Sequence, residues 1–172
     1  MSDTRTGRAF IDRSRAYLTG EYLPKIRASL ALLSREDIWW RPNEASNSVG
    51  NLVLHLAGNV RQWIVHGVGG RDDVRDRPAE FSAAAGRDAG ELLGILEEAL
   101  READAVLAGL DPSSLHELRA IQGLDVSVLE AIYHVVEHFA GHTYQIIYVA
   151  KARSGEDLGF WKVEEGRATP AW

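Results

Sequence analysis

Apolar residues recur at intervals of three and four along most of this chain, which is the spacing that lines one face of an α-helix. The cleanest series lies in residues 88–110, where spacings of four and three alternate as they do along the seam of a helical bundle. Similar series span residues 8–33, 48–66 and 127–153. Four helical segments with almost no strand pattern predict an all-α fold.

Residues that cap helices mark where two of these segments begin. A serine or asparagine side chain accepts a hydrogen bond from a backbone N–H in the first turn of a helix, and an acidic side chain three positions later accepts one from the backbone N–H of the cap. Ser127 and Glu130 have this spacing, and one of residues 46–48 is expected to cap the second helix. Within the first segment, Gly20 and Pro24 predict a kink, because proline lacks a backbone donor.

The segments that connect the helices set the expected topology. The connector between the second and third helices holds the highly charged residues 71–81, is expected to be irregular, and at roughly 20 residues is long enough to cross one end of a bundle. Residues 113–125 form a further connector, and the tail, residues 154–172, has no apolar period and is expected to lie across the bundle surface. The chain thus predicts a single domain over residues 1–172, built as a four-helix bundle with its core at residues 8–153 and with either a simple up-and-down order or a crossover.

Composition narrows the range of functions. The chain has 172 residues, 45% of them hydrophobic, and a formal net charge of −6, and its lysines and arginines form no stripe that would favour nucleic-acid binding. No apolar run approaches the roughly 20 residues of a membrane span, and residues 1–8 lead into no signal-peptide hydrophobic region. We therefore expect a cytoplasmic protein without nucleic-acid or membrane partners. The absence of cysteine excludes thiolate ligands and a cysteine nucleophile, so any thiol must come with the substrate.

Three histidines follow one another at four-residue intervals in the last helical segment, namely His134, His138 and His142. On an α-helix this spacing stacks the imidazoles along one side. The outer two lie roughly 12 Å apart along the axis, whereas a zinc–nitrogen bond is about 2.0–2.1 Å long, so only an adjacent pair shares an ion readily. The spacing leaves open whether His138 pairs with His134 or with His142, and either pair needs a further ligand from elsewhere.

The second helix offers that ligand in His55, which stands in a polar stripe with Asn51 and Asn59 inside an otherwise apolar sequence. Polar groups in such a position are costly to bury unless they are paired or coordinated. Two stripes that face each other across a bundle would form a three-histidine site with open coordination positions, which is the arrangement of a catalytic rather than a structural metal ion. The alternative is a hydrogen-bonded histidine cluster or a pH-sensitive core.

Other catalytic classes have no motif in this chain. It lacks His-Glu-x-x-His, the paired Glu-x-x-His of di-iron bundles, Gly-x-Ser-x-Gly and the glycine-rich loops that bind phosphates. No general base is evident, because Glu137 points about 100° away from its neighbour His138 around the helix. Glu80, in the charged connector, could reach the site. His66 is expected about 16 Å from His55 along the same helix and is not a partner for it.

Five stretches of the sequence match a pattern that occurs together in one group of proteins. They are residues 23–26, 38–42, 46–59, 75–81 and 134–146. Through them the chain resembles the DinB/YfiT-like superfamily of bacterial metal-binding helical bundles, and more closely its branch of uncharacterised DinB-like proteins. The resemblance covers roughly residues 8–162, and it is most specific at the histidine of the second helix and at the paired histidines before Gln145.

The resemblance implies an up-down-down-up four-helix bundle, in keeping with the long second connector. It also implies a metal triad of one histidine on the second helix and two, four apart, on the last, which here are His55, His138 and His142. His134 then lies beside the site or in the core. Members of this superfamily often have glycine at the position just before Gln145, where this chain has Tyr144. The phenol of Tyr144 would narrow the pocket or place a hydroxyl near the ion.

Relatives in this superfamily include thiol-dependent transferases and isomerases that use low-molecular-weight thiols. The resemblance thus implies a metal-dependent enzyme that acts on a small molecule, as a thiol-dependent S-transferase or a hydrolase, and the alternative is a non-catalytic metal- or small-ligand-binding stress-response protein. We expect a divalent transition metal, zinc or nickel in preference to iron. Asn59 and Gln145 continue the helical faces of the ligands and are expected beside them. Trp63 is expected to line either the pocket or the core. Related bundles often form homodimers, so a homodimer is expected here too.

Overall fold

Helices make up most of the chain. The computed structural model describes residues 2–172. Its long helices are α1 (Ser2–Tyr17), α2 (Leu23–Ala31), α4 (Val49–Val60), α6 (Ala89–Gly109) and α7 (Val128–Ser154). The connections between them hold the shorter helices α3 (Arg35–Trp39) and α5 (Arg77–Ser82) and the 3₁₀ turn η3 (Pro112–His116). Helical structure is thus confirmed in all four segments for which the sequence predicts it.

Two stretches of π-helix interrupt the regular helices. Residues Leu18–Tyr22 (η1) join α1 to α2, and residues Arg61–Val68 (η2) extend α4. The irregularity predicted at Gly20 takes the form of η1, in which a turn holds one more residue than in an α-helix. Pro24 falls in the first turn of α2, where the lack of a backbone donor is tolerated.

Side-chain caps begin the helices where the sequence predicts them. Ser48 caps α4 and Ser127 caps α7, each in a reciprocal pair with the residue three positions later. Asn51, the partner of Ser48, has a second role, because its Nδ2 donates to the backbone carbonyls of Glu80 at 2.8 Å and Ala83 at 2.7 Å. The cap of α4 therefore also holds the segment that contains α5.

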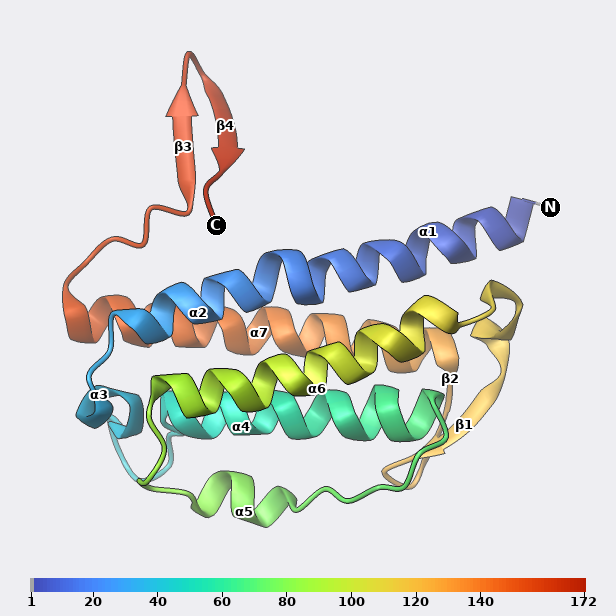
Figure 1. The fold of residues 1–172 in the computed structure, drawn as a ribbon, viewed down its shortest axis with the longest axis horizontal. Helices are drawn as coiled ribbons and strands as arrows, with labels where there is room; N and C mark the ends of the chain where they lie inside the picture. The colour runs from blue at the N-terminus through green and yellow to red at the C-terminus, as the bar shows by residue number, and fades with distance from the viewer. Residues whose placement is uncertain (1) are drawn as a thin grey trace.

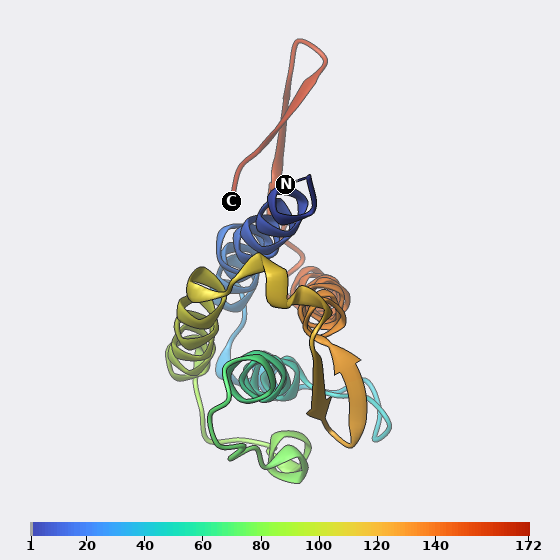
Figure 2. The same ribbon diagram turned by 90° about the vertical axis from the view of Figure 1, so that its right-hand side faces the viewer.

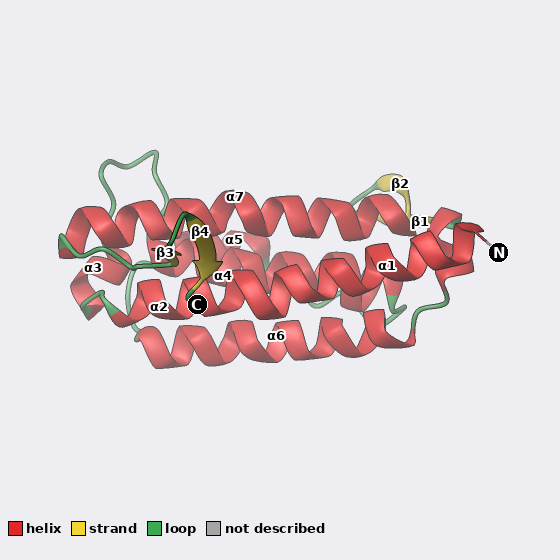
Figure 3. Cartoon of the chain, turned by 90° about the horizontal axis from the view of Figure 1, so that it is seen from above, coloured by secondary structure: helices red, strands yellow, loops and turns green. Residues whose placement is uncertain are grey.

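The long helices lie side by side around one core (Figures 1 and 3). Helix α4 packs against both α6 and α7, and α2 packs against α7. In the end view of Figure 2, α5 lies on the outer side of α4, away from α1. The core is filled by fully buried apolar side chains from all of these helices, among them Ile11, Ile26, Leu56, Leu96 and Phe139. Within residues 2–172, no helix is both long enough and apolar enough to cross a membrane.

Two β-hairpins depart from the predicted all-α fold. The first pairs β1 (Leu118–Ile121) with β2 (Leu124–Ser127), and the second pairs β3 (Trp161–Glu164) with β4 (Arg167–Pro170). Each turns through two residues with positive φ, Gln122-Gly123 and Glu165-Gly166. Turns of this kind favour asparagine or aspartate before the glycine, so glutamine and glutamate concealed the hairpins in the sequence.

The tail also differs from its predicted position across the bundle surface. Strands β3 and β4 project away from the helices (Figure 1), and every residue in them is exposed. Because the two strands satisfy each other's backbone hydrogen bonds, they form regular structure without packing on the helices. Trp172 returns to the helices after the hairpin, where its Nε1 donates to the carbonyl of Gly20 at 2.9 Å and its ring lies 3.9 Å from Nζ of the buried Lys25.

The sequence predicts an irregular connector after η2, but part of this connector is helical. It contains α5, which is capped by Asp76 through a hydrogen bond from the backbone N–H of Ala79 at 3.1 Å and carries Pro78 in its first turn. Helix α5 packs against α4. This contact buries Glu80, which is 8% exposed, against the helix that carries His55.

Candidate metal centre

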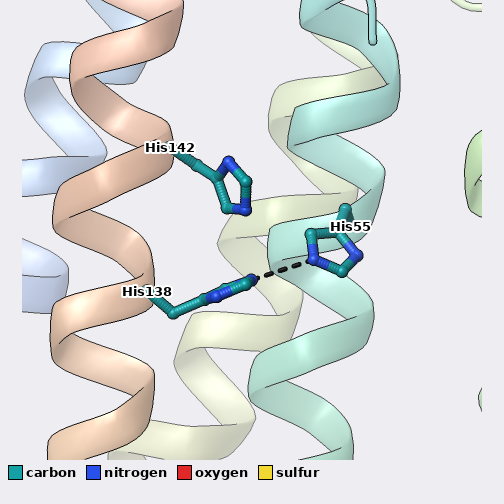
Figure 4. A group of neighbouring side chains, drawn as sticks. All are labelled: His55, His138 and His142. Atoms are coloured by element: carbon teal, nitrogen blue, oxygen red, sulfur yellow. Dashed lines mark hydrogen bonds between the residues drawn. The ribbon is translucent and has the colours of Figure 1, made fainter. Parts of the chain in front are cut away.

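Three imidazole rings from two helices converge at one place (Figure 4). His55 comes from α4, and His138 and His142 come from α7. Each offers one ring nitrogen, and these nitrogens all lie within 4.8 Å of one another. Nε2 of His55 and Nε2 of His138 are 2.9 Å apart. A tetrahedral zinc ion holds its nitrogen ligands about 3.4 Å apart, so the spacing of the three rings suits a single ion.

His134, one turn before His138 on α7, lies outside this group. Its Nε2 is 3.3 Å from Nδ2 of Asn59, and its ring centroid is 4.1 Å from that of Trp63. Both of these side chains are buried, and Oδ1 of Asn59 and Nε1 of Trp63 have no hydrogen-bond partner among the described residues. Of the two pairs that the spacing on the last helix allowed, the structure brings His138 and His142 to His55.

Glu80 fixes the orientation of the His55 ring. Its Oε2 lies 3.0 Å from Nδ1 of His55, and the ring of Phe81 packs against the imidazole at a centroid distance of 4.8 Å. A ring nitrogen that donates to a carboxylate carries the proton, which leaves the lone pair on the other nitrogen. His55 therefore presents an unprotonated Nε2 to His138.

A buried arginine keeps Glu80 ionised. Arg75, whose side chain is 3% exposed, donates from Nε and Nη2 to the two carboxylate oxygens at 2.7 and 2.8 Å. Burial raises the pKa of Glu80, but the hydrogen bonds and charges of Arg75 and His55 outweigh it and hold the pKa below its ordinary value. Nη2 of Arg75 also lies 3.0 Å from Nδ1 of His55, so the arginine contacts both the carboxylate and the imidazole.

Gln145 has the corresponding role for His142. Its Oε1 lies 2.8 Å from Nδ1 of His142, so the amide oxygen accepts the Nδ1 proton and the lone pair stays on Nε2. Two of the three imidazoles thus have one nitrogen held by an oxygen acceptor. The other nitrogen of each is left free to bind an ion.

The surroundings of the histidines also disfavour protonation. Burial lowers the pKa of His138 from 6.5 to about 3, and the neighbouring rings of His142, His55 and His134 act in the same direction. Burial likewise lowers the pKa of His134 and of His142. Neutral imidazole is the form that binds metal ions, so no proton has to be removed from these rings near neutral pH.

A hollow of about 560 Å³ opens beside the histidines. Its lining residues are His55, Asn59, Arg75, Arg77, Gln122, His134 and His138. A volume of this size accommodates a small molecule. No further histidine or carboxylate from residues 2–172 joins the three-histidine group. The group is therefore open on the side of the hollow.

Tyr144 does not line the hollow beside the histidines. It is 55% exposed, its ring centroid is 5.7 Å from Nζ of Lys25, and with Gln145 it lines a separate hollow of about 610 Å³. Its phenol is not among the groups that line the hollow beside His138. Glu137 is exposed on α7, as its position around the helix predicts.

One family comparison covers nearly the whole chain. A family model described as a protein of unknown function, DUF1572, matches residues 5–167. The chain belongs to this family. The matched DUF1572 region contains α4, α5 and α7, and therefore every residue of the candidate centre. No curated protein matches the sequence.

Two residues around the centre, Arg75 and Gln122, received no role from the sequence. Glu80 was considered as a connector residue that could reach the site, but its contact with His55 was not predicted. A signal for Glu80 does exist, because Asp76 followed by Pro78 is a typical start of a helix and a helix there packs Glu80 on one face. Nothing local in the sequence links that face to His55.

Proposed function

We propose that this DUF1572 protein is a metal-dependent enzyme of the DinB-like superfamily. His55, His138 and His142 would bind a divalent transition metal ion, zinc or nickel. The proposal depends on the convergence of three imidazole nitrogens within 4.8 Å of one another. It includes an up-down-down-up four-helix bundle, for which the long connection from α4 through α5 to α6 is the support.

The residues present fit such an ion. All three donors are imidazoles, which zinc, nickel and iron accept. Glu80 and Gln145 hold protons at Nδ1 of His55 and His142, which directs both Nε2 lone pairs toward the group. Three protein ligands leave at least one coordination position for another molecule, and the hollow lies beside them.

The chemistry we propose is thiol-dependent transfer on a small molecule. The ion, when bound, supplies Lewis acidity that favours the thiolate form of a substrate thiol. The chain contributes no thiol of its own, since it has no cysteine. Its residues orient the ligands, disfavour protonation of His138 and His142, and leave a hollow of about 560 Å³ for the substrates. Hydrolysis, the other reaction considered, would use the same residues with water in place of the thiol. The formation of a homodimer stays a prediction.

Elemental analysis of the purified protein tests the metal centre. We expect close to one equivalent of metal per chain, lost in a His55→Ala variant and retained in a His66→Ala variant. His66 is the matched control because it lies on the same helical segment but contacts the backbone carbonyl of Arg71 instead. Equal metal content in the His55→Ala variant and the unmodified protein would rule out the proposed ligand set.

A screen of the metal-loaded protein with small thiols and an electrophilic co-substrate then tests catalysis. Turnover that is absent in the His138→Ala variant would support the enzyme. Stable metal binding without turnover of any thiol or ester would favour the alternative of a metal- or small-ligand-binding protein.

A further inference from the structure

One cation in the hollow beside the candidate centre has no partner. Two arginines line this hollow, and Arg75 is fully engaged by the carboxylate of Glu80. The side chain of Arg77 is exposed and makes no ion pair or hydrogen bond with any of residues 2–172. Its guanidinium carbon instead lies 5.0 Å from the ring centroid of Phe81. Arg77 thus keeps its hydrogen-bond donors free for a ligand.

The position of Arg77 is set by contacts that lead directly to the histidines. Arg77 begins α5, and Phe81 follows four residues later on the same helical face. Phe81 also packs against His55, with 4.8 Å between the two ring centroids. Arg77 and His55 therefore contact the same phenyl ring, which places the guanidinium near the imidazole.

The charges around the hollow have one sign. None of its lining residues is acidic, although the chain has 25 acidic and 19 basic residues. Glu80 lies behind the His55 ring and is neutralised by Arg75. A hollow lined by uncompensated positive charge raises the local concentration of small anions. Gln122, whose Nε2 donates to Oε1 of Gln62, adds an amide to the same wall.

We propose that Arg77 binds the anionic group of a small thiol whose sulfur reaches the metal held by the three histidines. The substrate class is a thiol that carries a carboxylate, sulfonate or phosphate a few bonds from sulfur. This inference rests on the proposed function, since the thiol is the proposed co-substrate. Arg77 is the specificity-determining residue of the centre, and its guanidinium donates charge-assisted hydrogen bonds to the anionic oxygens.

Thiol binding to the cobalt(II)-loaded protein tests this inference without a turnover assay. Sulfur bound to cobalt gives a charge-transfer absorption band, and its growth during a titration yields a Kd. The probes are mercaptoethanesulfonate, mercaptopropionate and the neutral mercaptoethanol. The sulfonate is informative because it is a poor metal ligand and does not chelate the ion. We expect both anionic thiols to bind about tenfold more tightly than the neutral one, the effect of one charge-assisted hydrogen bond.

Variants of two arginines separate recognition from folding. The Arg77→Gln variant should bind mercaptoethanesulfonate, which does not chelate the ion, with the affinity of mercaptoethanol, and Arg77→Lys should recover part of the preference. The Arg71→Gln variant is the matched control, because Arg71 is an exposed arginine of the same connector that lines a different hollow. It should keep the full preference. Cobalt content is measured for each protein, so that loss of the ion is not mistaken for loss of the anion.

Two results would overturn the inference, and they differ from failure of the proposed function. Equal affinity for anionic and neutral thiols in the unmodified protein, or a preference that survives in Arg77→Gln, excludes Arg77 as the anion-binding residue while thiol binding at the metal stands. The absence of any thiol band in a cobalt-loaded protein contradicts the proposed thiol chemistry itself, and the inference falls with it. Preferential binding of the anionic thiols that is lost only in Arg77→Gln supports both.

Discussion

Oε2 of Glu80 lies 3.0 Å from Nδ1 of His55, the ring nitrogen that does not face His138. This contact joins two residues that the sequence places 25 positions apart. It defines which nitrogen of His55 carries the proton, and Arg75 keeps the carboxylate charged so that it accepts that proton's hydrogen bond. The contact therefore makes Glu80 a positioning residue for the candidate centre.

Replacement of Glu80 by glutamine is expected to weaken metal binding by about 10–100-fold, because the charged acceptor behind the His55 ligand is lost. Competition with a chelator of known affinity measures the effect. The control is Glu102→Gln, which also removes the carboxylate partner of an arginine but lies outside the three-histidine group. An unchanged metal affinity in Glu80→Gln would mean that Glu80 serves only to neutralise Arg75.

Acid is expected to destabilise the metal-free protein through His138. The folded state lowers the pKa of this residue from 6.5 to about 3. Between these values the unfolded chain binds a proton that the folded chain does not, so stability is intact above about 6.5 and falls as the pH drops toward 3. Urea unfolding across this window gives the slope. The His138→Gln variant should show a shallower pH dependence, and an identical slope would show that other groups are responsible.

A methyl group at Gly58 is expected to displace the carboxylate of Glu80 and thereby disturb the candidate centre. A Cβ at this position in α4 would overlap Oε1 of Glu80. We expect Gly58→Ala to destabilise the fold by about 1–3 kcal/mol and to weaken metal binding. The control is Gly94→Ala in α6, where no atom lies within 4 Å of the added Cβ. That change should stabilise the protein by up to about 1 kcal/mol, and equal effects of the two substitutions would contradict the predicted overlap.

The C-terminal tryptophan is expected to stabilise the fold through Lys25. The Trp172 ring lies 3.9 Å from the ammonium of this buried lysine. Loss of a cation–π contact in Trp172→Ala should cost about 1 kcal/mol, as measured by denaturant unfolding. Val163→Ala, in the exposed hairpin, should change stability by less than about 0.5 kcal/mol. If the two variants are equally stable, the tail does not hold Trp172 against Lys25 in solution.

The sequence predicted the helices and the convergence of the three histidines better than the surroundings of that group. The apolar period of three and four located each long helix, and Ser48 and Ser127 marked two starts, because both signals are local. His55 stood out since a histidine in an apolar helix requires a partner. Spacing on the last helix allowed two pairs, however, and only the resemblance to a family favoured His138 with His142.

The remainder of the site depends on contacts between distant segments. Glu80 and Arg75 lie among many charged residues of one connector, and only the packing of α5 on α4 distinguishes them. Gln122 reaches the hollow because it occupies the turn of a hairpin whose strands have four residues each. Strands that short carry too little alternation to be recognised from the sequence.

The candidate centre consists of two halves, one on α4 and α5 and the other on α7. Asn51 on α4 donates a hydrogen bond to the backbone carbonyl of Glu80, so the contact between Glu80 and His55 does not depend on α7. The relative position of His138 and His142 is likewise set by the regular spacing of one helix. Within the three-histidine group the halves meet where the ring of His55 packs against those of His138 and His142, at centroid distances of 4.9 and 5.2 Å. An ion bound by all three histidines would cross-link α4 and α7. Removal of the ion would therefore weaken the packing of α4 against α7 and leave the contacts within each half unchanged.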